Sequence, residues 1–239
     1  MKSLKPRLFA FSLLAFAAVV SSCNTQCVTG SGKETSETRS VSDFAKIETG
    51  GTIKLILKQG PKTVKVFADD NIQKLIETDV EGNTLKIDMD GNFCNSGPVT
   101  VYVSNPDFQA IRVSGAVEVT SEGRLNTKDF YLGLSGSCEV NLDLSVAGVK
   151  TEASGSSVIY LKGQAGAHDL DISGSGKLEA FDFVVGNYKI NTSGSSECRI
   201  NVLNSLDVNT SGASDIEYKG NPKQVSDNHS GASTVKKVQ

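Results

Sequence analysis

Residues 151–178 read TEASGSSVIYLKGQAGAHDLDISGSGKL and contain two copies of one pattern. In each copy a short alternating stretch leads to a Ser-Gly-Ser motif, at Ser154 and at Ser173, and an apolar residue follows five positions after that serine. Ser-Gly followed by Ser or Ala occurs seven times, and the spacings between the serines are 21, 19, 19, 20, 18 and 19 residues. These serines are Ser114, Ser135, Ser154, Ser173, Ser193, Ser211 and Ser230. The near-constant spacing identifies an internal repeat.

The positions around each serine repeat as well. The fifth residue after the serine is apolar or Cys: Val119, Val140, Ile159, Leu178, Cys198, Ile216 and Val235. The third residue before it is Ile111, Leu132, Thr151, Leu170, Ile190, Val208 or Asp227, and the residue directly before it is Val113, Leu134, Ala153, Ile172, Thr192, Thr210 or His229. Residues two apart in a strand share a face, so both positions are predicted to point inward. Gly supplies the backbone angles of a tight corner between two short strands.

This repeat predicts an all-β fold, a right-handed single-stranded β-helix-like solenoid with rungs of about 19 residues and regular repeats over residues 111–235. One rung cannot bury its own apolar face, whereas rungs stacked about 4.8 Å apart share a continuous core. The polar Asp227 and His229 of the last copy are typical of a terminal, capping rung. The chain lacks the six-residue period of left-handed hexapeptide coils and the Gly-Gly-x-Gly-x-Asp pattern of calcium-binding β-rolls.

The region before Ser114 is less regular but still rich in β-favouring residues. Thr52–Leu57 and Thr63–Phe67 flank Gly60-Pro61, which indicates a hairpin. We expect this part to cover the N-terminal end of the solenoid, where strand edges would otherwise be unpaired. Residues 43–239 are therefore predicted to form one β-solenoid domain.

The N-terminus has the features of an export and lipidation signal. Basic residues precede an apolar run from Leu8 to Val20, which is shorter than the roughly 20 residues needed to span a bilayer core. The sequence Val-Ser-Ser-Cys then matches a bacterial lipobox, so residues 1–22 are predicted to be a lipoprotein signal peptide and Cys23 the lipidated residue. Asn24, rather than Asp, after this cysteine favours the outer membrane.

Residues 23–42 are rich in Ser, Thr, Gly and Glu without periodicity and are predicted to form a flexible tether. A disulfide between Cys27 and Cys94 is one option, which would tie this tether to the domain. Cys198 takes an inward position of the repeat, and Cys138 lies three rungs earlier. Three rungs separate them by about 14 Å, so these two cysteines are predicted not to pair.

Composition argues against several function classes. The formal net charge is −3 and the basic residues are scattered, so nucleic acid is not an expected partner. Trp is absent and aromatic residues make up 6% of the chain, which weakens a carbohydrate-enzyme interpretation because sugar-binding clefts usually use aromatic platforms. The residue spacing indicates neither a cofactor nor a metal site.

One column of polar residues is a candidate binding strip. The residue two positions before each serine lies between the two positions that are predicted to point inward. If those positions do point inward, this residue points outward, and the copies of it form a vertical row. The candidate strip in this row is Glu152, Asp171, Asn191, Asn209 and Asn228. One hypothesis is that the strip binds a cation or glycan hydroxyls; the other is a ladder in which side-chain amides bond along the stack.

The repeated serines are not predicted to be nucleophiles. A catalytic serine needs a base such as His within hydrogen-bond reach, and the chain has only His168 and His229. His229 adjoins Ser230, but adjacent residues in a strand point to opposite faces. No catalytic residue is therefore assigned.

Several stretches resemble the GIN domain, a family described as the head domain of auto-transporter adhesins. They are Thr29 to Gly32, Phe44 to Gly50, Asp70 to Ile72, Glu77 to Leu85 and the Ser-Gly ladder, and the resemblance spans about residues 43–231. The resemblance implies a right-handed β-helix-like fold on secreted or lipid-anchored proteins. It implies no established biochemical activity.

These observations lead to one functional expectation and two alternatives. We expect a membrane-attached, lipid-anchored envelope protein that presents a β-solenoid for binding or adhesion, without catalysis, to a glycan or protein ligand. The first alternative is a periplasmic envelope-structural or stress-linked accessory protein. The second alternative is a polysaccharide-acting β-helix enzyme.

Overall fold

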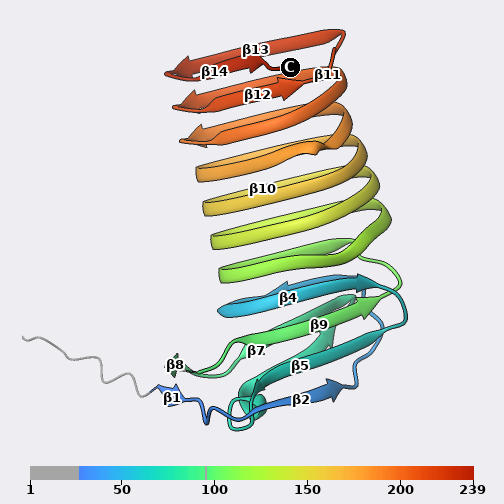
Figure 1. Ribbon diagram of the computed structural model, residues 1–239, viewed down its shortest axis with the longest axis vertical. Coiled ribbons are helices and arrows are strands. Elements are labelled where there is room, and N and C mark those ends of the chain that lie inside the picture. Colours follow the sequence, from blue (N-terminus) through green and yellow to red (C-terminus); the bar gives the residue numbers. More distant parts are fainter. Residues whose placement is uncertain (1–26, 95) are drawn as a thin grey trace, which may run out of the picture.

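The computed structural model describes residues 27–94 and 96–239 and is built almost wholly from β-strands (Figure 1). The prediction of an all-β fold is confirmed, since the regular elements of these residues are strands apart from one short 3-10 helix, η1 (Gln73–Leu75). No helix within the described ranges is long and apolar enough to span a membrane. The predicted signal peptide, residues 1–22, and the predicted lipidation site, Cys23, lie outside the described residues.

The strands divide into an irregular N-terminal set and a regular C-terminal set. The first set is β1 (Val28–Thr29), β2 (Glu34–Arg39), β3 (Lys46–Thr49), β4 (Thr52–Gln59), β5 (Thr63–Asp69), β6 (Ile76–Glu81), β7 (Thr84–Met89), β8 (Phe93–Cys94) and β9 (Val99–Asn105). The second set is β10 (Ala110–Gly194), β11 (Glu197–Gly212), β12 (Asp215–Lys219), β13 (Gln224–Gly231) and β14 (Thr234–Lys237). The long β10 is continuous extended chain that passes through several corners (Figure 1).

Parallel pairing places equivalent positions of successive copies side by side. Leu178 pairs with Cys198, and Ser193 with Ser211, in the parallel ladder between β10 and β11. Ser211 in turn pairs with Ser230 between β11 and β13. Figure 1 shows the resulting turns of chain stacked along the long axis, from the N-terminal strands at one end to β13 and β14 at the other.

The inward-facing positions form the core, as the alternation predicts. The third residue before each serine is fully buried in the first six copies, whereas Asp227 in the last copy is exposed. A further inward position, three residues after the serine, carries small buried residues such as Cys138, Ser157, Ser196 and Ser214. Cys138 and Cys198 are both free and buried, so the predictions that they do not pair and that Cys198 points inward are confirmed.

An additional copy of the repeat precedes those found from the sequence. Gly51 has a positive φ of 84°, and the N–H of Ala116 donates to its carbonyl oxygen over 2.8 Å. Strands β3 and β4 flank this corner and pair in parallel with β10, for example Leu55 with Val119. This copy has Gly-Gly in place of Ser-Gly and is separated from the next one by an insertion that holds β5 to β9.

The prediction of a flexible tether is wrong for residues 28–39, which contain two paired strands. Strand β2 pairs with β5 in antiparallel register, β1 pairs with β8, and Cys27 forms a disulfide with Cys94. Strand β2 lies at the edge of the sheet and is held by backbone hydrogen bonds to β5. Most of its side chains are exposed, so its sequence carries no apolar alternation. The N-terminal strands extend the sheet in the order β4-β9-β5-β2.

Glycine is required at the repeated corner for two reasons. Gly155 has a φ of 92°, and a Cβ placed there would lie 2.6 Å from the carbonyl oxygen of Gly136 in the turn below. The same close approach recurs at every later corner of the stack. A side chain at this position would therefore separate two turns and break the backbone bonds between them.

We expect Gly155→Ala to destabilise the protein by about 2–5 kcal/mol, since it adds backbone strain to a steric overlap. The matched control is Gly123→Ala, because Gly123 has a φ of 86° but no atom within 4 Å of the place that an added methyl carbon would take. That control carries the strain alone, about 1–2 kcal/mol. Urea unfolding followed by circular dichroism measures both values, and equal losses would contradict the close-packed corner.

Candidate functional site

Four residues of the predicted polar strip form a side-chain ladder. The Asn191 amide donates to the Asp171 carboxylate over 2.6 Å. The Asn209 amide donates to the Asn191 oxygen over 3.4 Å, and the Asn228 amide to the Asn209 oxygen over 3.3 Å. The alternative of an amide ladder is thus what the structure shows for these residues. Their polar groups satisfy one another along the stack.

Glu152, the fifth residue of the strip, is held differently. Its carboxylate accepts a hydrogen bond of 2.6 Å from the Tyr131 hydroxyl and forms an ion pair of 2.6 Å with Lys150. Lys150 and Tyr131, in that order, lower the pKa of Glu152, so this carboxylate stays ionised. The same hydrogen bond raises the pKa of Tyr131. Both effects follow from a donor placed against a carboxylate.

The outward column has no side chain at Gly133, which lies between Arg112 and Glu152. A Cβ at Gly133 would lie 2.9 Å from the Tyr131 ring. The missing side chain therefore lets this ring lie across the column and reach Glu152. Arg112 stacks on the ring, with its guanidinium carbon 4.4 Å from the ring centroid. This stacking is a cation–π contact.

These residues line a shallow groove of about 630 Å³ that follows the outward column. Arg112, Tyr131, Glu152, Asp171 and Asn191 lie along it, together with the exposed hydroxyls of the repeated serines from Ser114 to Ser193. Three predicted strip residues thus come together in the groove, whereas Asn209 and Asn228 continue the ladder beyond its lining. Arg112 and Tyr131 were not predicted to be site residues. The sequence feature that could have indicated them is Gly133, the one residue without a side chain in an otherwise polar column.

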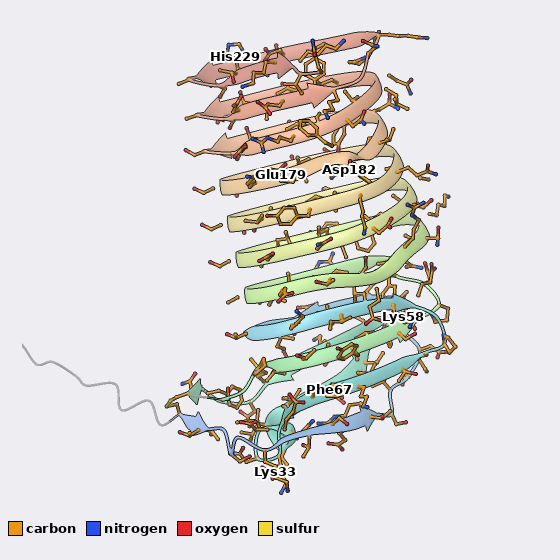
Figure 2. The ribbon with its side chains drawn as sticks, viewed as in Figure 1. Lys33, Lys58, Phe67, Glu179, Asp182 and His229 are labelled. Atoms are coloured by element: carbon orange, nitrogen blue, oxygen red, sulfur yellow. A yellow bond between two sulfur atoms is a disulfide. The ribbon has the colours of Figure 1, made fainter. Side chains whose placement is uncertain are left out.

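The second outward face carries a network of ion pairs. Arg199 lies 2.8 Å from both Glu179 and Glu197, and 3.1 Å from Glu217 in the next turn. Glu217 also pairs with Lys236 over 2.9 Å. Figure 2 shows Glu179 on the sheet face toward the viewer. Charges of opposite sign therefore alternate between turns here, and this face offers control positions for the groove.

The two histidines do not serve the exposed serines. His168 is buried, with its Nε2 2.9 Å from the Thr151 hydroxyl and its ring against Tyr188 and Phe183. Burial lowers the pKa of His168 to about 3, so the ring is neutral near pH 7. His229 lies in the terminal turn (Figure 2), where its Nδ1 contacts Asp227 at 2.9 Å.

These features define a class of protein: an all-β fold of stacked parallel strands with a groove along the stack. The family described as "Putative auto-transporter adhesin, head GIN domain" matches residues 43–222, and the chain belongs to this family. No curated protein matches the chain.

Solved structures share the fold. A "putative adhesin" from Bacteroides fragilis NCTC 9343 superposes with a TM-score of 0.83 at 23% identity, covering 88% of this chain and 100% of the other. A "putative lipid binding protein" from Parabacteroides distasonis ATCC 8503 gives 0.71 at 19% identity, covering 90% and 100%. A "putative adhesin" from Parabacteroides merdae ATCC 43184 gives 0.65 at 21% identity, covering 89% and 99%. At these identities the likeness establishes the fold alone.

We expect the stability of the protein to fall by about 2 kcal/mol between pH 7 and pH 5 because of His168. The unfolded chain takes up a proton at this residue near pH 6.5, whereas in the folded protein the pKa is lowered to about 3. Stability is therefore lost as the pH falls through the unfolded value. Urea unfolding at several pH values measures the slope. His168→Gln keeps a hydrogen-bond partner for Thr151 but cannot titrate, so an unchanged slope in this variant would contradict the assignment.

Proposed function

We propose that this protein is a lipid-anchored envelope protein that binds a glycan or protein ligand in the groove, in an adhesion-type role without catalysis. The observation that carries the proposal is the groove itself, in which Arg112 and the exposed serine hydroxyls face solvent over several turns. Membership of the GIN family supports it, as do the adhesin names of two structural relatives.

We infer that the stacked turns form a right-handed β-solenoid with rungs of about 19 residues. Support comes from the register between copies, in which Gly194 pairs with Gly212 and Gly212 with Gly231. The N–H that follows each of these corners also donates to the glycine carbonyl of the turn below, as from Ala213 to Gly194 over 2.8 Å. A solenoid of this kind displays a long, rigid face without large loops.

The disulfide bears on how the proposed anchor would hold the domain. Cys23, the proposed lipidation site, lies four positions before Cys27, and Cys27 is bonded to Cys94. Four residues span at most about 14 Å. A lipid on Cys23 would therefore hold the β1 end near the bilayer, in the outer membrane on our proposal. The β13 and β14 end lies at the opposite end of the stack and would point away (Figure 1).

We expect the wild-type protein, expressed with its own N-terminus in a Gram-negative host, to fractionate with membranes and to be removed from intact cells by trypsin. Cys23→Ala should abolish acylation and release the protein into a soluble fraction, since a stable anchor needs the acyl chains. Mass spectrometry of the N-terminal peptide and immunoblots before and after shaving measure these outcomes.

Three results would contradict parts of this proposal. Protein that resists trypsin in intact cells but not in lysed cells would favour the periplasmic alternative. An unacylated Cys23 in membrane-bound protein would overturn the anchor. Cleavage of a polysaccharide by the purified protein would favour the enzyme alternative.

A further inference from the structure

We propose that the part of the groove beside Gly133 and the Tyr131 ring, which we call the hollow, binds the carboxylate of an acidic saccharide, with Arg112 as the anion-binding residue. This inference rests on the proposed function, because it names the ligand class of the same groove. Glu152 and the neighbouring serine hydroxyls would then hydrogen-bond hydroxyl groups of the same sugar.

Arg112 is the arginine of the described chain that has no carboxylate within 4.0 Å. Each of the other described arginines has such a partner: Arg39 with Glu37 at 3.3 Å, Arg124 with Asp143 at 2.7 Å, and Arg199 with Glu179, Glu197 and Glu217 at 2.8 to 3.1 Å. A guanidinium remains charged at any physiological pH. Arg112 therefore has no direct ion-pair partner in the groove, although its charge acts on nearby Glu152 and lowers the pKa of that carboxyl.

The Tyr131 ring fixes the guanidinium in a useful orientation. A guanidinium that stacks on an aromatic ring keeps its N–H donors free at the edge of its plane. Those donors match the two oxygens of a carboxylate in a bidentate contact. Tyr131 itself is held by its 2.6 Å hydrogen bond to Glu152, so little side-chain freedom remains to be lost on binding.

Hydroxyl-binding groups surround the hollow. Glu152 accepts one hydrogen bond from Tyr131 and one ion pair from Lys150, but two carboxylate oxygens can accept about four. Ser114 and Ser135 also line the groove and are exposed. A sugar that carries a carboxylate next to hydroxyl groups can satisfy both sets at once.

A peptide fits the same groove less well. An extended peptide gains affinity by pairing with a free strand edge and by filling apolar side-chain pockets. The groove crosses the stacked strands, whose backbone groups already pair with neighbouring turns. Apolar residues such as Leu134 and Ile172 border the groove, but they are almost wholly buried and offer a peptide little side-chain surface. The more exposed groups along the groove are the repeated serines and Arg112, with the carboxylates of Glu152 and Asp171 beside them.

The test uses the full mature chain with Cys23→Ala and the Cys27–Cys94 disulfide intact. Binding is measured on an array of oligosaccharides that carry uronic or sialic acids, with their carboxyl-reduced counterparts and a set of acidic peptides, and hits are titrated by calorimetry. We expect binding to acidic saccharides that is lost on carboxyl reduction. Arg112→Gln should raise the Kd at least about tenfold, as expected for the loss of charge-assisted hydrogen bonds.

Two further variants separate a specific site from general charge. Arg199→Gln removes a positive charge from the ion-pair face and should leave the Kd within about twofold. Glu48, whose Cα is paired with that of Arg112, lines the same groove, so Glu48→Gln should lower the Kd by removing a like charge from the ligand's surroundings.

Several outcomes would overturn the inference. The inference is contradicted if carboxyl-reduced sugars bind equally well, or if acidic peptides alone bind. It is also contradicted if Arg112→Gln leaves the Kd unchanged, or if Arg112→Gln and Arg199→Gln weaken binding equally. Binding of neutral glycans that Arg112→Gln does not affect would remove the carboxylate and keep the proposed function. If no saccharide or peptide on the array binds, both the acidic-saccharide inference and the proposed binding function of the groove are contradicted. The trypsin experiment on intact cells tests the lipid anchor independently.

Discussion

The hydrogen bonds between successive glycine corners are the constraint on which the structure depends. The N–H that follows one corner donates to the glycine carbonyl of the turn below, as from Ser195 to Gly174 over 2.9 Å and from Ala232 to Gly212 over 2.9 Å. These bonds require the corner backbones to be in close contact, which only glycine allows at a positive φ. Once the corners are in register, every other position of the repeat falls into a column, so inward columns become the core and outward columns become continuous rows of side chains.

The groove follows from the same constraint. A column of like residues becomes a ladder, as for Asp171 and the three asparagines that follow it, and the residues of a ladder bond to one another. A column becomes available to a ligand where the repetition breaks. Gly133 is such a break, because the absent side chain admits Tyr131 and leaves Arg112 stacked but without an ion pair. The proposed binding function thus depends on the exceptions to the repeat, while the repeat holds them in place.

Spacing and alternation were sufficient to predict the strand content, the inward faces and the outward column, because these depend on periods of two residues and of one turn. Strand β2 was missed because an exposed edge strand carries no apolar alternation, and the copy at Gly51 because an insertion separates it from the others. The sequence did place Glu152 and Asp171 in one row. It could not show that Tyr131 leaves its own column to reach Glu152, since that contact depends on the space above Gly133. The Cys27–Cys94 bond was one option in the sequence and is present in the structure.

Removal of one complete turn tests the in-register stacking most directly. Deletion of residues 156–174 joins Gly155 to Ser175 and removes 19 residues, so the Ser-Gly-Ser corner is retained. If each turn contacts only its neighbours, the shortened protein should fold with the same far-UV circular dichroism per residue and unfold cooperatively in urea. Deletion of residues 156–164 alone joins the chain out of register and should prevent folding. If both deletions unfold the protein alike, or both leave it folded, the stacked repeat is not what holds the structure together.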